Sequence, residues 1–187
     1  MTTDGLRFRA AGPDDAEQIA LLHADSWRRH YRGAYSDSYL DGDVVADRRS
    51  VWSSLLAGQA GSTTILAEDA AGLVGFVRVI FDADDRWGSL VDNLHVIHGR
   101  QRGGIGTALL ACAARAVAER AAGRAVYLWV LEQNTASQRF YRALGGTCVE
   151  KAPVPPPGGV PSRLTGSPNG LRFTWPDCSA LLPHPSG

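Results

Sequence analysis

The chain has 187 residues, of which 44% are hydrophobic, and its 19 basic residues balance 19 acidic ones. This length and composition favour a single globular domain over residues 1–187 with a sizeable core. The balanced charge gives no indication of nucleic-acid binding, and no apolar run is long enough to span a bilayer. The three cysteines have unrelated spacings, which argues against a disulfide framework or a zinc site. We therefore predict a cytoplasmic protein that needs no metal.

The first third of the chain has the pattern of one strand and two helices. Residues 6–9 alternate apolar and basic side chains, as in a short strand. Residues 12–15 begin a helix, because Pro13 and the two acids after it suit a first helical turn. Gly33 closes this helix. A second helix is predicted from Val44 to Leu56, where apolar residues recur and glycines follow.

The next segment predicts an antiparallel meander. Apolar runs rich in β-branched residues indicate strands at residues 63–68, 73–81 and 89–96. Residues 69–72 have the composition of a hairpin turn, and a polar loop joins the second strand to the third. Such short links are typical of antiparallel neighbours, because parallel strands need a long crossover connection.

Two helices and a buried strand come next. Periodic apolar residues predict a helix that ends near Gly123, and a continuous apolar run predicts a buried strand at residues 125–131. The second helix begins near Asn134, where Thr135 and Gln138 have the spacing of a capping box.

The C-terminal region combines short strands with irregular chain. Residues 147–151 and 171–175 have strand-like patterns. Between them, residues 152–170 are rich in Pro and Gly and lose all periodicity, which is typical of a lid or a disordered loop. From residue 176 we expect an irregular tail.

A glycine-rich stretch, Gln101–Thr107 (the glycine loop), lies between a predicted strand and a predicted helix. Free backbone N–H groups at the positive end of a helix dipole bind anions, most often phosphate. A nucleotide-binding P-loop needs a lysine after Gly99 and Gly104, where Ile105 stands. A dinucleotide-binding loop needs a third glycine where Leu109 stands. Both classes are therefore disfavoured.

Two motifs resemble those of the GNAT superfamily of N-acetyltransferases. Gln101–Gly106 matches the acyl-CoA motif Gln/Arg-x-x-Gly-x-Gly/Ala, and Asn134–Gly145 matches Asn-x-x-(Ala/Ser)-x-x-Phe-Tyr-x-x-x-Gly. The resemblance covers residues 6–151. It implies an α/β fold with a mixed, mostly antiparallel sheet of six to seven strands and about four helices. The sheet would splay between its fourth and fifth strands, with acetyl-CoA as co-substrate in the gap.

The resemblance also implies a set of residues that contact CoA. The glycine loop would hold the pyrophosphate through backbone N–H groups, and the end of the fourth strand would pair with the pantetheine arm and polarise the acyl carbonyl. The alternatives are a site for another anion or a plain tight turn. The expected CoA contacts are Leu94, His95, Val96, Gln101, Arg102, Gly103, Gly104, Ile105, Gly106, Thr107, Asn134, Ser137, Phe140 and Tyr141.

Tyr141 and Asp92 are the candidate catalytic residues. A phenol can protonate the thiolate that leaves when an amine takes the acetyl group, although Tyr141 could also be an aromatic core residue. Many relatives carry a glutamate as general base where Leu90 stands. Asp92 is the ionisable residue on the same face of a regular strand. His95 is the second choice for the base, because it faces the opposite side unless a β-bulge intervenes.

The acceptor site is the least specified part. Trp27, Arg28 and Tyr31 resemble the Trp-Arg-x-x-Tyr segment of a bacterial branch of the family, in which the first helix walls the acceptor site. As bare sequence, Trp27 and Tyr31 also suit a core. Residues 153–161 are another possible wall.

These observations predict an N-acetyltransferase that moves acetyl directly from acetyl-CoA to a primary amine of a small molecule, such as a metabolite or an antibiotic. One alternative is a protein N-terminus or lysine as acceptor. A second is a non-catalytic CoA-binding sensor or structural subunit, and a third is a nucleotide-binding module. We expect no nucleic-acid or membrane partner, and a monomer or homodimer.

Overall fold

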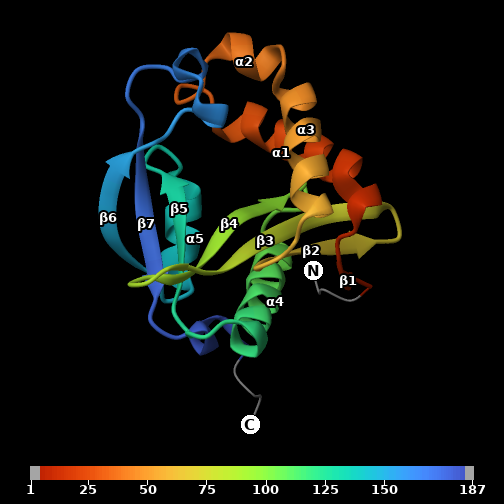
Figure 1. Ribbon diagram of the computed structural model, residues 1–187, viewed down its shortest axis with the longest axis vertical. Coiled ribbons are helices and arrows are strands. Elements are labelled where there is room, and N and C mark those ends of the chain that lie inside the picture. Colours follow the sequence, from red (N-terminus) through yellow and green to blue (C-terminus); the bar gives the residue numbers. More distant parts are fainter. Residues whose placement is uncertain (1–4, 184–187) are drawn as a thin grey trace.

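The computed structural model describes residues 5–183. Within this range the strands form one seven-stranded sheet in the order β1-β2-β3-β4-β5-β7-β6 (Figure 1). The strands are β1 (Arg7–Ala10), β2 (Ser62–Asp69), β3 (Gly72–Asp84), β4 (Gly88–Val96), β5 (Val126–Leu131), β6 (Thr147–Pro153) and β7 (Asn169–Trp175). The helices are α1 (Ala16–His30), α2 (Asp37–Asp41), α3 (Val44–Ala57), α4 (Ile105–Arg120) and α5 (Thr135–Ala143). Only β4 and β5 run parallel, which confirms the mixed, mostly antiparallel sheet.

The sequence patterns locate most of these elements. The meander of β2, β3 and β4 is antiparallel as predicted, and α3 begins at the predicted Val44. The first helix differs at its start, because Pro13–Asp15 form a 3-10 turn before α1 begins at Ala16. The short helix α2 was not predicted. It lies between polar residues and buries only Tyr39 and Leu40, so it has too few apolar positions to show a period.

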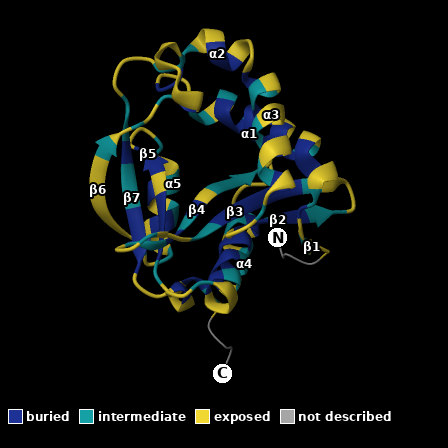
Figure 2. Ribbon diagram, viewed as in Figure 1, coloured by how far each residue is buried: buried dark blue, intermediate teal, exposed yellow. Residues whose placement is uncertain are grey.

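Two layers of the core lie one on each face of β2–β4, and a third cluster joins α1 to α2 and the start of α3. On one face, α1 and α3 pack against the sheet through fully buried residues that include Ile19, Trp52 and Phe76. On the other face, α4 packs through Leu109 and Leu110. Each such side chain contributes about 1.5–3 kcal/mol relative to exposure. Figure 2 shows the buried sides of these helices turned toward the sheet. Val91 anchors β4 in the layer beneath α4.

The sheet opens between β4 and β5. The two strands pair only through Ser89 with Val126 and Leu90 with Tyr127. Beyond these pairs β5 continues along β7, so the rest of β4 has one edge without a neighbouring strand. The predicted splay between residues 89–96 and 125–131 is therefore confirmed.

The Pro- and Gly-rich segment 152–170 has a defined course. Two 3-10 turns, Pro157–Gly159 and Pro161–Arg163, carry it from β6 toward β7. The Ser36 N–H donates to the Arg163 carbonyl at 2.9 Å, and the Thr165 N–H donates to the Ala34 carbonyl at 2.9 Å. These bonds pin the segment to the connection between α1 and α2 (Figure 1), so it forms a wall and not a disordered loop. Among the described residues, none of the helices combines the length and apolar character needed to cross a bilayer.

Candidate active site

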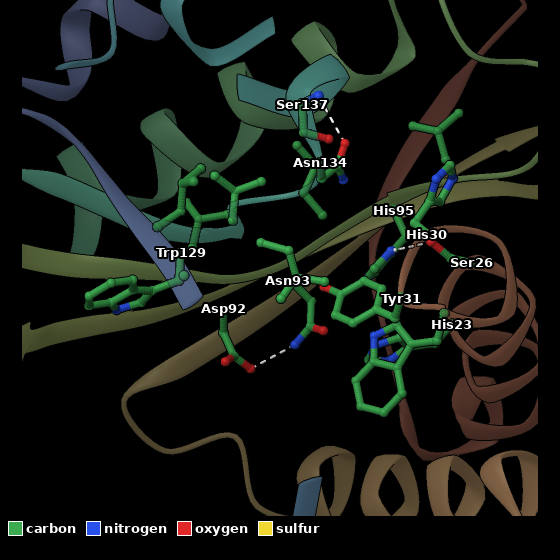
Figure 3. Close-up of a pocket in the computed structure, with 18 of the residues that line it drawn as sticks. His23, Ser26, His30, Tyr31, Asp92, Asn93, His95, Trp129, Asn134 and Ser137 are labelled. Atoms are coloured by element: carbon green, nitrogen blue, oxygen red, sulfur yellow. Dashed lines mark hydrogen bonds between the residues drawn. The ribbon is translucent and has the colours of Figure 1, made fainter. Parts of the chain in front are cut away.

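A cleft of about 1020 Å³ lies where β4 and β5 separate. Its walls come from α1, α3, β4, the glycine loop, β5, α5 and residues 152–155. Figure 3 shows side chains from helix, strand and loop converging on this cavity. The splay thus brings the free edge of β4 and the start of α4 to the same cleft.

The glycine loop is shaped as an anion site. Gly104 precedes α4 with a φ of 82°, and Arg102 has a φ of 64°, both in the left-handed region. The first helical hydrogen bond runs from the Ala108 N–H to the Gly104 carbonyl at 2.9 Å. The N–H groups of the preceding turn therefore have no partner within the helix. Together with the helix dipole they favour a negatively charged group beside the cleft.

Most, but not all, of the expected loop residues reach the cleft. Gln101, Arg102, Gly104, Gly106 and Thr107 line it. Gly103 and Ile105 do not, and Ile105 is buried in the core with 4% of its surface exposed. A Cβ on Gly106 would lie 3.3 Å from the Phe140 ring, which shows how closely α4 approaches α5.

Along the end of β4, the backbone N–H and C=O groups of successive residues point alternately toward β3 and toward the free edge. The Ile97 N–H donates to the Val74 carbonyl at 2.9 Å, and residues two apart on an antiparallel strand repeat this direction. The backbone groups of His95 therefore turn toward β3, opposite Phe76. Those of Leu94 and Val96 turn toward the free edge. Of the three residues expected to offer backbone groups to pantetheine, His95 is thus the exception.

A β-bulge at Asp92 changes the face of the sheet on which the following side chains of β4 lie. Asn93 pairs with Arg78, whereas Val91 pairs with the next residue, Val79, so Asp92 is an extra residue on β4. His95 therefore does not lie on the far side of the strand, as it would in a regular one. Its side chain faces α1, where its Nδ1 and the Ser26 Oγ share a hydrogen bond of 2.8 Å. Asp92, Asn93 and His95 all line the cleft (Figure 3).

The environments of the ionisable groups on β4 differ. Burial raises the pKa of Asp92, although 35% of its side chain stays exposed, and Arg78 opposes the shift from 3.8 Å. The Asn93 amide donates to Asp92 Oδ2 at 2.7 Å. Burial lowers the pKa of His95 to about 3, so this imidazole is neutral at pH 7. Asp92 is therefore the stronger base of the two.

His23 lies beside His95 in the interior, with ring centroids 4.5 Å apart. The Trp52 indole N–H donates to His23 Nδ1 at 3.0 Å, and Nε2 is buried without a partner among the described residues. Burial lowers the pKa of His23 well below its usual value. A neutral imidazole pair thus connects the two helices to the floor of the cleft.

The start of α5 is capped by Asn134 and not by the predicted capping box. Asn134 Oδ1 accepts a hydrogen bond from the Ser137 N–H at 3.1 Å. Gln138 instead donates to the Glu132 carbonyl at 2.6 Å. Both Asn134 and Ser137 line the cleft, so the capping residue also faces the cavity.

Tyr141 and Phe140 face the cleft from the same helix. Tyr141 is 8% exposed, and its hydroxyl makes no hydrogen bond to any described residue. Burial raises the pKa of this phenol, with the nearby Tyr31 adding to the effect, so the proton is retained at neutral pH. The side chain is thus a buried aromatic ring that lines the cavity and keeps its phenolic proton at neutral pH.

The opposite wall is aromatic. Trp27 and Tyr31 line the cleft with ring centroids 5.4 Å apart, and Tyr35 lies 5.0 Å from Trp27. Arg28 does not reach the cavity. Its Nε donates to the Leu40 carbonyl at 2.8 Å, so it fastens α2 to α1.

Several lining residues were missed from the sequence: His23, Ser26, Tyr35, Arg48, Asn93 and Trp129. Arg48 did carry a signal. It falls midway between Val44 and Trp52, four residues from each, and all three are buried on one face of α3. A charged residue within an apolar stripe at helical spacing is a candidate site residue, because charged side chains are almost never fully buried unless they are paired.

Comparison with known proteins agrees with this geometry. Residues 24–145 match the acetyltransferase (GNAT) family. The match spans more than half of the chain, and the chain therefore belongs to the GNAT family of acetyltransferases. It is accordingly an acetyl-CoA-dependent N-acetyltransferase, as its two motifs predicted.

Several relatives match more than nine-tenths of the chain. It is 29% identical over 176 residues to the uncharacterized N-acetyltransferase YuaI of Bacillus subtilis, covering 92% of this chain and 94% of that protein. The PaiA N-acetyltransferase of Thermoplasma acidophilum, solved with coenzyme A, superposes with a TM-score of 0.70 at 17% identity, over 91% of this chain and 99% of that one. YncA of Salmonella typhimurium, solved with acetyl-CoA, has a TM-score of 0.64 at 19% identity, over 97% of both chains.

Proposed function

We propose that this chain transfers acetyl to the primary amine of a small-molecule acceptor within the cleft between β4 and β5. Acetyl-CoA supplies an activated thioester, and the amine nitrogen bonds to the acetyl carbon as the carbon–sulfur bond breaks. The observation that carries the proposal is the position of Tyr141, whose side chain lines the cleft and whose hydroxyl keeps its proton at neutral pH.

The donor half is formed by the glycine loop and the edge of β4. Unpaired N–H groups at the start of α4 suit a pyrophosphate, and Asn134 and Ser137 offer polar groups across from them. The free backbone groups of Leu94 and Val96 suit an extended amide-bearing arm. They also suit hydrogen bonding to an acyl carbonyl oxygen. PaiA and YncA, which have the same fold, were solved with CoA and acetyl-CoA, and this supports the assignment.

Two side chains can move the protons that the reaction requires. Asp92, whose pKa is raised, accepts a proton from the amine, directly or through water. Tyr141 donates a proton to the departing sulfur. The two lie on opposite sides of the splay, on β4 and α5, so the acceptor and the thioester would meet between them.

A small acceptor fits the closed wall on the α1 side. The bridge between Tyr35 and Leu164 joins the α1–α2 connection to the segment 152–170. Pro153 and Pro155 extend this wall along the cleft. An acceptor that enters here is enclosed by aromatic and proline side chains, which suits a compact amine better than an extended polypeptide.

The test replaces Tyr141 by Phe, which removes only the hydroxyl. We expect kcat for thiol release with a panel of small amines to fall by about 100-fold, the scale of one general acid. The dissociation constant of acetyl-CoA, measured by calorimetry, should stay within about twofold of the wild-type value, because the phenol acts on the leaving thiolate and not on bound CoA. Tyr127→Phe serves as a matched control, because Tyr127 is a buried tyrosine on β5 that does not line the cleft. Full turnover in Tyr141→Phe would refute the proposed acid, and acetylation of peptides in preference to every small amine would refute the acceptor class.

A further inference from the structure

Arg48 places a buried guanidinium in the acceptor wall. It is 8% exposed, lines the cleft from α3, and lies over the Trp27 ring with 4.2 Å between Cζ and the ring centroid. Its Nε and Nη2 donate to the same oxygen, Asp47 Oδ2, at 3.1 and 2.6 Å. Its Nη1 has no hydrogen-bond partner among the described residues and is not sealed from solvent. One donor nitrogen is therefore free to bind a ligand.

The carboxylate of Asp47 does not balance this charge alone, because a second arginine shares it. Arg163 Nη1 donates to Asp47 Oδ1 at 2.8 Å, and the Tyr39 hydroxyl donates to Oδ2 at 2.7 Å. Two guanidinium groups thus share one carboxylate. The cluster keeps an excess positive charge next to the acceptor wall.

No other group among the described lining residues neutralises the excess. Asp92 is the only acid among them, and it faces the buried Arg78. The pKa values of His23 and His95 are lowered, so both rings are neutral at pH 7. The positive charge of Arg48 contributes to the lowering of both. The field of Arg48 therefore reaches the floor of the cleft, where the single carboxylate of Asp92 is acted on by both Arg78 and Arg48 and cannot match both charges.

We propose that Arg48 binds a carboxylate on the acceptor, and that the natural acceptors are amines that carry a carboxylate, such as free amino acids. The inference rests on the proposed acetylation of small amines and names their chemical class. A guanidinium held in place by Asp47 and Trp27 loses little freedom when it binds an anion, and charge-assisted hydrogen bonds are among the stronger ones. A polyamine would instead bring further positive charge next to Arg48. The aromatic rings of Trp27, Tyr31 and Tyr35 would pack against an apolar side chain of the acceptor.

The first measurement uses binding, so that it does not depend on turnover. The probes are N-acetyl amino acids and their carboxamides, with phenylalanine, methionine and alanine side chains, added to the protein with CoA. Each pair differs in one carboxylate and has no basic amine. We expect the acid to bind at least tenfold more tightly than the amide, which corresponds to about 1.4 kcal/mol. Arg48→Met should abolish the difference, and Arg48→Lys should retain part of it.

Arg49→Met is the matched control. Arg49 follows Arg48 on α3, is half exposed, pairs with Glu17 at 2.7 Å and does not line the cleft. This variant should keep the acid-to-amide ratio of the wild type.

The second measurement compares kcat/KM for L-phenylalanine and L-phenylalaninamide. The kcat/KM for L-phenylalanine divided by that for L-phenylalaninamide should be at least tenfold lower in Arg48→Met than in the wild type. The intrinsic difference between the two amines is the same for both proteins and therefore cancels in that comparison. Equal binding of acids and amides by the wild type would overturn the inference, as would an unchanged ratio in a folded Arg48→Met or Arg48→Lys. Selective binding of the acids without acetylation of any amine would leave the carboxylate site standing and refute the proposed function.

Discussion

At the scale of single residues, the surroundings of Tyr141 suit it to act as an acid, and those of Asp92 suit it to act as a base. Burial raises the pKa of Tyr141, which keeps this hydroxyl protonated, and raises the pKa of Asp92, which strengthens it as a base. His95 shares a hydrogen bond with Ser26, and burial lowers its pKa to about 3. A base works best when its pKa approaches the working pH, so Asp92 is better suited than His95.

Replacing Asp92 by Asn tests this assignment. We expect kcat to fall by about 100-fold while the affinity for acetyl-CoA is unchanged. In the wild type, kcat should decrease as the pH falls through the raised pKa of Asp92, because a protonated carboxyl cannot accept the proton of the amine. The variant should lose this acidic limb of the pH profile.

His95→Gln is the companion variant, because His95 lines the same cleft and bonds Ser26. It should retain the acidic limb. If His95→Gln removes the limb and Asp92→Asn keeps it, the assignment of the base is wrong.

At the scale of elements, Gly104 makes the turn that leads from the glycine loop into α4. Gly104 has a φ of 82°, which costs a residue with a Cβ about 1 kcal/mol or more. We therefore expect Gly104→Ala to weaken CoA binding about tenfold and to lower the CoA-induced rise in melting temperature. Gly103→Ala is the control, because Gly103 has no positive φ and does not line the cleft. An equal loss of CoA affinity in both variants would show that the added methyl group, and not the backbone conformation, matters in this loop.

The sequence predicted the elements whose periodicity extends over several turns or strands. α4 and β5 follow from their apolar patterns, and the antiparallel meander follows from its short links. The bulge at Asp92 could not be predicted, because one inserted residue in a nine-residue strand leaves alternating patterns on both sides of it. This single residue decides whether His95 faces α1.

The donor half of the site was more predictable than the acceptor half, for a physical reason. Backbone groups at a helix start bind phosphate, and their glycines leave a local motif. The acceptor wall is assembled from side chains distant in sequence, such as Tyr31 on the chain after α1 and Val154 beyond β6. Within that wall, the Trp-Arg-x-x-Tyr segment indicated Trp27 and Tyr31, and the apolar stripe of α3 carried a local signal for Arg48.

At the scale of the whole molecule, the neutral histidines His23 and His95 link the helical layer to the sheet. His23 accepts from Trp52 of α3, and His95 of β4 bonds Ser26 of α1. Their rings lie in contact with each other and with Phe76 of β3. Protonation of either ring would place a charge in this interior contact, so the packing of the layers depends on pH.

We therefore expect acid to destabilise the fold from about pH 6.5 downward, the usual pKa of a histidine in an unfolded chain. Below that pH the unfolded chain binds protons at His23 and His95 that the folded chain does not bind. The reason is that burial lowers the pKa of both residues in the folded protein, that of His95 to about 3. The free energy of unfolding, from urea titrations between about pH 7 and pH 4, should fall by at most about 1.4 kcal/mol per pH unit for each histidine. Variants His23→Gln and His95→Gln should each flatten this slope, whereas His98→Gln, at an exposed position after β4, should not. Asp15, whose pKa is lowered to about 2, loses its contribution progressively below about pH 5, but this loss is common to the wild type and the histidine variants and cancels when their slopes are compared. A slope that is unchanged in both buried variants would mean that these histidines do not carry the acid sensitivity of the fold.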